Sequence, residues 1–307
     1  MKNLKYKSQI VHLLMVLVAG FVINGCKPTA GCNDPKATNY EADADRFGEC
    51  VYLIDTGGII VPDTAIKMNI EIKATIDGKP LEMNKKYSNK LGKEFELSTL
   101  KFYLANMKLA FQASGKREIK DVELFDFDTS KPLNPSIPYW TNKTECVLLG
   151  GGKFDQIYIG VGVGIEENEE FSPNKYPASH ALSGTYTQMA WDWKAKYIFS
   201  MIEGVVDSSG DGKMDRSFFY HSGHSDMYRL AVLDFDKTYD LKNGETVNIV
   251  INLDFLKVLD VLKIETNLEG KSHTGNPEEK VLSSTVQTNL SRSLSIEKIE
   301  IIPALAL

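Results

Sequence analysis

The residues best suited to chemistry lie close together in the stretch H-S-G-H-S-D-M. They are His221, His224 and Met227. Imidazole nitrogen and thioether sulfur are good ligands for copper, so this stretch could chelate a transition metal. Residues three apart point to opposite faces of a flat strand, but Ser222-Gly223 can turn the chain and bring both rings to one side. The other interpretation is a pair of surface histidines that only form hydrogen bonds.

Two tryptophans lie shortly before this stretch. Trp191 and Trp193 are two residues apart, so on a strand they share one face. They form either an aromatic binding platform or a ridge of the hydrophobic core. Met201 is a further soft ligand for Cu(I). Two other histidines, His180 and His273, lie in polar loops, where we expect solvated side chains.

A second candidate metal site is the loop D-S-S-G-D-G-K-M-D. Its oxygen-bearing side chains stand at positions 1, 3, 5 and 9 and belong to Asp207, Ser209, Asp211 and Asp215. Gly212 at position 6 allows the sharp turn of a calcium-binding loop. Position 12 is Phe218 rather than the bidentate Glu of an EF-hand, so an EF-hand is excluded. The sequence leaves calcium and a metal-free polar turn open.

Charge and motifs exclude two functional classes. The chain has 307 residues, with 41 acidic residues against 35 Lys and Arg, giving a formal net charge of -6. No overall positive field exists to attract a nucleic acid. The sequence contains no G-x-S-x-G, phosphate-binding G-x-x-x-x-G-K or H-E-x-x-H motif. We therefore expect a binding protein and not an enzyme.

The elements that position these residues are predicted to be strands. Ile66 to Ile76 alternates strictly between apolar and polar residues, and Asp77-Gly78 follows as a hairpin turn. Further strands are predicted at 95–97, 100–111, 122–127, 156–163, 197–203, 218–221, 228–234 and 247–253. Many short strands without regular strand-helix alternation favour an all-β fold, an antiparallel β-sandwich.

The C-terminal part departs from this pattern. Leucines recur every three residues from Leu253 to Leu262, and a helical stripe runs from Val281 to Leu290. We predict one or two short helices there, covering an end or face of the sandwich. The alternating run Ile296 to Ile302 predicts a last strand.

The N-terminus has the pattern of an export signal. Lys2, Lys5 and Lys7 precede an apolar run, which ends in Ile23-Asn24-Gly25-Cys26. This ending resembles the lipobox of bacterial lipoproteins, which implies cleavage before Cys26 and lipidation of that residue. Ordinary secretion, with Cys26 as a plain thiol, is the other interpretation. We expect a cell-envelope protein that its lipid anchors to the outer membrane.

Two cysteines frame a compact stretch after the lipobox. The pattern G-C-x-D-P-x-A-x-N-Y, closing with G-x-C-x-Y, resembles a short module that recurs in secreted bacterial proteins. The resemblance implies a disulfide between Cys32 and Cys50. The fourth cysteine, Cys146, lies among apolar residues and is expected to be a buried thiol. Domain boundaries follow as 1–25 for the signal peptide, 26–62 for the lipidated disulfide module and 63–307 for the β-sandwich.

The order of four motifs resembles the MbnP-like family, whose members are periplasmic copper-binding proteins associated with methanobactin loci. The motifs are K-F-Y-L-A-N-M-K-L (101–109), I-Y-I-G-V-G-V-G-I-E-E-N (157–168), M-A-W-D-W-K-A-K-Y-I-F-S-M-I-E-G (189–204) and F-F-Y-H-S-G (218–223). The resemblance implies a β-sandwich that binds one copper ion through histidines and a tryptophan oxidised to kynurenine. It also implies a partner that performs the oxidation, a di-haem protein of the cytochrome c peroxidase type.

Carried over to this chain, the family histidine matches His221 and the tryptophan pair matches Trp191 and Trp193. We take Trp193 as the one expected to be modified. Better-studied members have a further histidine near their first strands, whereas this chain has none between Cys26 and Ser179. The alternative function is a surface module that binds a glycan or a protein through the tryptophan pair instead of a metal.

Overall fold

The computed structural model describes residues 65–127, 142–177, 180–183, 188–191, 196–274 and 276–304, and two short strands near the N-terminus. Those strands, β1 (Ala30–Gly31) and β2 (Arg46–Phe47), pair in parallel. The chain divides into two units, Met1–Pro62 and Asp63–Leu307. The predictions for the signal peptide and for Cys26, Cys32 and Cys50 fall outside the described residues. Among the helices that are described, none combines the length and the apolar character needed to cross a membrane.

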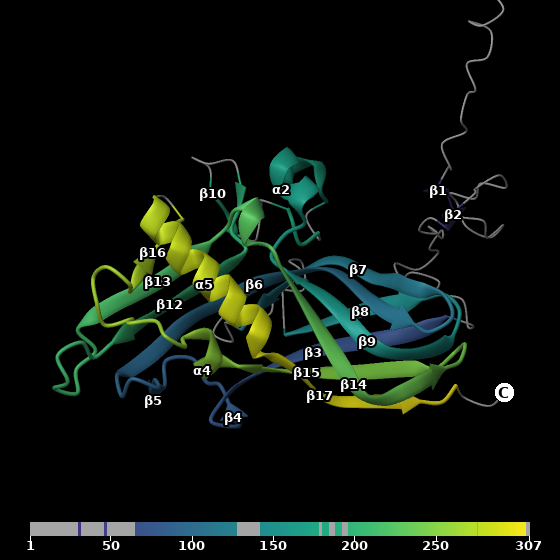
Figure 1. Cartoon of the computed structure of the whole chain (residues 1–307), viewed down its shortest axis with the longest axis horizontal. Coiled ribbons are helices and arrows are strands. Elements are labelled where there is room, and N and C mark those ends of the chain that lie inside the picture. The colour runs from purple at the N-terminus through teal and green to yellow at the C-terminus, as the bar shows by residue number, and fades with distance from the viewer. Residues whose placement is uncertain are drawn as a thin grey trace, which may run out of the picture. The chain divides into compact units, whose positions relative to one another are not determined.

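The second unit is built from two large sheets (Figure 1). Six strands of the eight-stranded sheet lie in the order β14 (Arg229–Leu241), β9 (Gly152–Val161), β6 (Glu94–Phe111), β12 (Ser200–Val206), β13 (Arg216–Ser222) and β16 (Lys271–Ser272). The other two strands, β5 (Lys86–Ser88) and β7 (Gly115–Asp126), pair with β6. Four strands of the five-stranded sheet lie in the order β17 (Leu294–Ile302), β15 (Thr246–Asp254), β3 (Ile66–Ile76) and β4 (Lys79–Pro80). The fifth strand, β8 (Lys143–Leu148), pairs with β3. The predicted all-β sandwich is confirmed.

Local sequence patterns match the strands closely. The alternation from Ile66 to Ile76 is β3 itself, with every second residue buried. Asp77 and Gly78 form the turn after it, both with positive φ, 50° and 71°. The two strands predicted at 95–97 and 100–111 are one long strand, β6, because the chain passes Ser98 as a bulge and keeps its pairing with β12.

Two described pairings in the second unit are parallel, which the sequence did not predict. β15 lies parallel to β3 in the middle of the five-stranded sheet, and β16 lies parallel to β13 at the edge of the larger sheet. Parallel neighbours need a long connection, so their pairing leaves no short turn signal in the sequence. The second parallel pair brings residues near 272 beside residues near 220.

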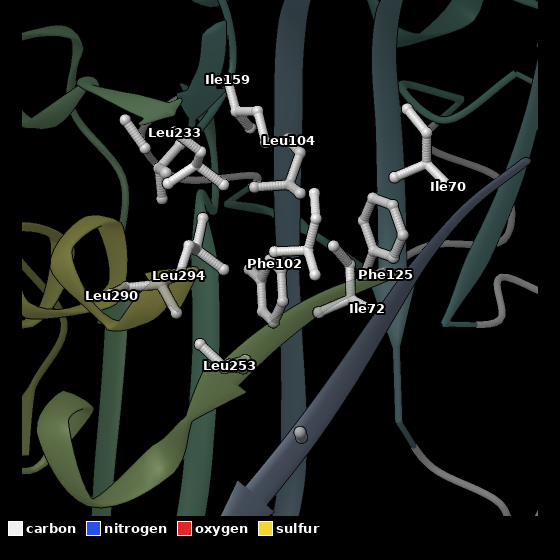
Figure 2. Close-up of a cluster of buried hydrophobic side chains, with 14 of the residues drawn as sticks. Ile70, Ile72, Phe102, Leu104, Phe125, Ile159, Leu233, Leu253, Leu290 and Leu294 are labelled. Carbon is white, nitrogen blue, oxygen red and sulfur yellow. The ribbon is translucent and has the colours of Figure 1, made fainter. Parts of the chain in front are cut away.

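The main core lies between the two sheets. Figure 2 shows side chains from both sheets and from the C-terminal helix α5 (Pro277–Ser293) meeting there, among them Ile70, Ile72, Phe102, Leu104, Phe125, Ile159, Leu233, Leu253, Leu290 and Leu294. Burying one such side chain contributes about 1.5 to 3 kcal/mol. The two helices predicted near the C-terminus are α5 and the four-residue α4 (Phe255–Val258). They pack against each other, and α5 also contacts β13 and β14.

A second, smaller core covers the other face of β6. The chain between β9 and β12 forms α2 (Ile165–Glu170), the 3-10 turn η1 (Pro173–Lys175), and the strands β10 (Ala190–Trp191) and β11 (Lys196–Tyr197), which pair with each other. Tyr103 and Ala105 of β6 belong to this cluster, whereas Phe102 and Leu104 belong to the main core. The larger sheet is therefore buried on both faces along this part of β6. We refer to this cluster below as the second core.

Candidate metal centre

Three adjacent strands present a row of side chains on the outer face of the larger sheet. On β12 and β13 the core-facing residues alternate with partly exposed ones, which include Met201, Glu203 and His221. Met201 is the register partner of His221. Ser272 of β16 is the partner of Tyr220, so His273, one residue further on, lies beside His221.

The imidazole rings of His221 and His273 are in contact. Their centroids are 4.7 Å apart and the ring planes are tilted by 48°. Phe219 lies edge-on against His273 at 4.5 Å between centroids, and it also contacts the His221 ring. The expectation of a solvated side chain at His273 was wrong, because β16 carries that residue onto the sheet. Only the pairing of β16 with β13 brings the two rings together, and no local pattern encodes it.

A carboxylate holds His221 from a neighbouring strand. Glu203 Oε1 lies 2.7 Å from His221 Nε2, and the Thr99 hydroxyl donates to Glu203 Oε2 at 2.8 Å. The side chain of His221 is 14% exposed and that of Glu203 is 35% exposed. The hydrogen bond with His221 is the largest influence on Glu203 and lowers the pKa of its carboxyl below the ordinary value. The pair is therefore a carboxylate and an imidazole N–H.

His273 is positioned by a buried group of hydroxyls under α5. The Thr274 hydroxyl donates to the carbonyl oxygen of His221 at 2.8 Å, and it also lies 3.1 Å from the Ser283 hydroxyl on α5. Ser272 and Ser283 hydroxyls are 2.6 Å apart. The His273 backbone N–H donates to Glu279 Oε2 at 3.0 Å. These contacts tie the backbone at both histidines to the first turns of the helix.

Trp191 lies against the chain just after His221. Its side chain belongs to the second core, and the residue is 5% exposed. A Cβ atom placed on Gly223 would come within 2.7 Å of Trp191 Cζ3 and 2.2 Å of the Tyr197 carbonyl oxygen. Glycine is therefore required at position 223, because its missing side chain makes room for the indole. Trp193 lies outside the described residues.

The other two residues of the predicted chelate face different surroundings. His224 precedes the 3-10 turn η2 (Ser225–Met227), and its Nδ1 lies 2.8 Å from Asp226 Oδ1 in the same turn. Met227 is 1% exposed and belongs to the second core, as does Met189. His221 thus contacts His273 and Glu203, whereas His224 contacts a carboxylate of its own loop.

The aspartate loop is held together by its own amides. Asp207 Oδ1 accepts from the backbone N–H of Gly210 at 2.6 Å, and its Oδ2 accepts from that of Gly212 at 2.6 Å. Burial opposes ionisation of Asp207, but these N–H groups and that of Asp211 keep the pKa of its carboxyl below the ordinary value. Asp215 accepts from the backbone N–H and the hydroxyl of Ser208. Hydrogen bonds within the loop account for its shape.

Across the part of the chain that the structure describes, no three His, Cys, Asp or Glu side chains form a group that could hold a metal ion. The three aspartates of the loop at 207–215 therefore do not converge. Cys146 is buried, and burial raises the pKa of its thiol to about 12, which keeps it protonated. The contact between His221 and His273, with Met201 alongside, is the arrangement in the described residues that best suits a transition metal.

Comparison with known protein families identifies one match. The sequence model of one protein family, described as MbnP, matches residues 65–278, a range that contains both His221 and His273. Among solved structures, MbnP from Methylosinus trichosporium is similar, with 14% sequence identity, a TM-score of 0.40, and an alignment that covers 68% of this chain and 80% of that one. No curated protein matches the chain.

Proposed function

Because this chain belongs to the MbnP family, we propose that it binds a copper ion in the bacterial cell envelope, with His221 and His273 as ligands. The observation that carries the proposal is the contact between these two imidazoles on adjacent strands, with ring centroids 4.7 Å apart. The proposed role is binding, as in a copper chaperone, scavenger or storage protein, and not catalysis. When bound, copper would add a one-electron redox centre to the outer face of the sheet.

The spacing of the two rings fits a shared ion. With metal–nitrogen distances of about 2.0 Å, two imidazoles on one ion have centroids roughly 4.5 to 6 Å apart. The observed 4.7 Å lies inside this range. Two imidazoles and a thioether form a donor set that suits copper, and Met201, the register partner of His221, is the proposed source of the thioether.

The tryptophans enter the proposal through the family. Trp191 packs against Gly223, and Gly223 comes two residues after His221. A modified ring at position 191 would therefore border the site. Two equivalents of peroxide cleave the indole C2–C3 bond and give N-formylkynurenine and two waters, and hydrolysis then releases the lost carbon as formate, so that kynurenine has one carbon fewer and one oxygen more than tryptophan. The proposed catalyst of the oxidation is a di-haem partner of the cytochrome c peroxidase type. Intact mass and peptide mapping of the native protein test this step, since the peptide spanning 191–193 would gain about 4 Da.

The envelope location and the lipid anchor at Cys26 belong to the same proposal. They are supported by the apolar run that ends in Ile23-Asn24-Gly25-Cys26. The alternative, a glycan or protein platform made by the tryptophan pair, has no support from Trp191, because that residue is 5% exposed.

Copper titration of single-histidine variants tests the ligand set. We expect His221→Ala and His273→Ala each to weaken copper binding by at least tenfold in a competition assay with a chromophoric chelator. His224→Ala and His180→Ala are the matched controls, and both should bind as the unaltered protein does. His180 is suitable because it stacks on Tyr176 within the second unit, with ring centroids 4.2 Å apart.

Loss of binding in His224→Ala together with full binding in His273→Ala would restore the local chelate of His221 and His224 and refute the site proposed here. Circular dichroism of each variant checks that the sheet is intact.

A further inference from the structure

The carboxylate of Glu203 forms a hydrogen bond with His221, one of the two proposed ligands. Resting on the proposed copper site, we infer that Glu203 is a positioning residue that fixes the tautomer of His221, so that Nδ1 is the nitrogen available to the metal. Glu203 touches the ring and not the ion. Its role is to hold the proton on the far nitrogen.

The hydrogen bonds of Glu203 determine where that proton lies. Glu203 Oε2 accepts from the Thr99 hydroxyl at 2.8 Å, and Oε1 lies 2.7 Å from His221 Nε2. A carboxylate can only accept, so Nε2 carries the hydrogen and donates it. A neutral imidazole has one N–H and one lone pair, and a metal binds the lone pair. The lone pair of His221 is therefore on Nδ1.

The strand geometry places Glu203 at the side of the ring. Its register partner on β13 is Phe219, whereas the partner of His221 is Met201, so the carboxylate reaches the imidazole diagonally. Glu203, His221 and His273 do not form a three-residue metal group, as no such group exists among the described residues. Carboxylates that hold the second nitrogen of a ligating histidine commonly orient the ring and raise its basicity.

A β-bulge and a glycine flank Glu203 and fix the position of its backbone. The register of β12 against β6 shifts between Glu203 and Gly204, where Ser98 is the extra residue. Bulges of this kind redirect the neighbouring side chain. A Cβ atom on Gly204 would lie 2.3 Å from the Glu96 carbonyl oxygen and 2.6 Å from Phe218 Cζ, so only glycine fits beside Glu203. The same bulge sets Thr99 opposite Glu203.

Nitrogen NMR of the metal-free protein tests the inference directly. Long-range proton–nitrogen correlation of ¹⁵N-histidine-labelled protein distinguishes a protonated ring nitrogen from a bare one, and His221→Gln identifies the His221 signals by their loss. We expect Nε2 of His221 to be protonated and Nδ1 to be bare. In Glu203→Gln, both tautomers should be populated, because an amide can donate to a ring nitrogen as well as accept from it. A proton on Nδ1 of His221 in the unaltered protein would overturn the inference.

The second measurement adds Cu(I), which is diamagnetic. The Nδ1 resonance of His221 should shift on Cu(I) addition, and Glu203→Gln should bind Cu(I) 10- to 100-fold more weakly, the usual effect of removing such a carboxylate. Thr99→Val removes only the support of Oε2 and should give a smaller loss. Glu297→Gln on β17, which breaks an exposed ion pair with Lys73, is the matched control and should behave as the unaltered protein.

The outcomes separate the two ideas. Unchanged tautomer and unchanged Cu(I) affinity in Glu203→Gln would overturn the inference and leave the copper site standing. An unaltered protein that binds no Cu(I) would overturn the proposed function and the metal part of this inference, while the NMR result would still decide whether Glu203 fixes the ring.

Discussion

At the scale of single residues, one buried carboxylate can organise a whole turn. Asp207 is 3% exposed and accepts hydrogen bonds from the backbone N–H groups of Gly210, Asp211 and Gly212. Gly210 and Gly212 have positive φ, 83° and 85°, which lets the chain curl around the carboxylate. The motif that resembled a calcium loop is thus a turn in which amide groups supply the positive ends of dipoles.

We therefore predict that Asp207→Asn destabilises the protein at neutral pH, because the amide can no longer accept on both sides. The pKa of Asp207 is lowered in the folded state, so its contribution is present above the unfolded pKa of about 3.9 and is lost as the pH falls through the lower folded pKa. Urea unfolding at pH 7 and at pH 2.5 to 4 should show the difference between the two proteins shrinking with acid.

Calcium chloride should leave the midpoint of urea unfolding of the unaltered protein unchanged, since the aspartates of the loop at 207–215 form no metal-binding group among the described residues. A clear stabilisation by calcium, absent in Asp207→Asn, would contradict this explanation and return the loop to the class of cation sites.

At the scale of elements, helix α5 ties the histidine pair to the rest of the fold. Asn276 caps the helix by accepting from the Glu279 backbone N–H at 2.9 Å, and its own amide donates to Glu279 Oε1 at 2.8 Å. The other oxygen of Glu279 accepts from the His273 backbone N–H at 3.0 Å. The cap of the helix and the position of His273 thus depend on the same carboxylate.

We predict that Asn276→Ala lowers the free energy of unfolding by about 1 kcal/mol, the usual cost of losing an N-cap. The exchange of the His273 amide hydrogen should also become faster, because Glu279 loses one of the contacts that orient it. Urea unfolding and hydrogen exchange measure the two effects. Asn276→Ser keeps an N-cap acceptor without adding a negative charge beside Glu279, so its free energy of unfolding should lie near that of the unaltered protein. An Asn276→Ala protein with full stability would show that α5 is held by packing alone.

At the scale of the whole molecule, the domain extends beyond the residues matched by its family. The match ends at residue 278, inside the first turn of α5. The rest of α5 and all of β17 follow, and they place Val286, Leu290 and Leu294 in the main core. β17 also covers the free side of β15. The sandwich needs these residues to close its core.

We predict that a chain of residues 63–307 unfolds in one cooperative transition, whereas a chain of residues 63–278 does not fold. Each large core side chain that is lost costs about 2 to 5 kcal/mol, and a domain has a total stability of about 5 to 15 kcal/mol. Thermal unfolding followed by circular dichroism compares the two chains. A folded 63–278 chain would mean that α5 and β17 are an addition to a complete sandwich.

The alternating runs of the sequence determined most of the strands, because a period of two is a local property that survives in any β arrangement with one buried side. The strand at 66–76, the Asp77-Gly78 turn and the helices near the C-terminus could be predicted in this way. The motifs around His221 and Trp191 also pointed to the family.

Only the tertiary structure decided which side chains meet. His273 lies 52 positions after His221, and a two-residue parallel strand brings their rings to 4.7 Å. Such a short strand has no periodicity to detect, and a parallel pairing has no turn to announce it. Glu203 similarly meets Thr99 through a bulge in the pairing of β12 with β6, and meets His221 through the pairing of β12 with β13. Spacing along the chain favoured His224 as the neighbour of His221, whereas strand pairing, which joins distant segments, places His273 against His221.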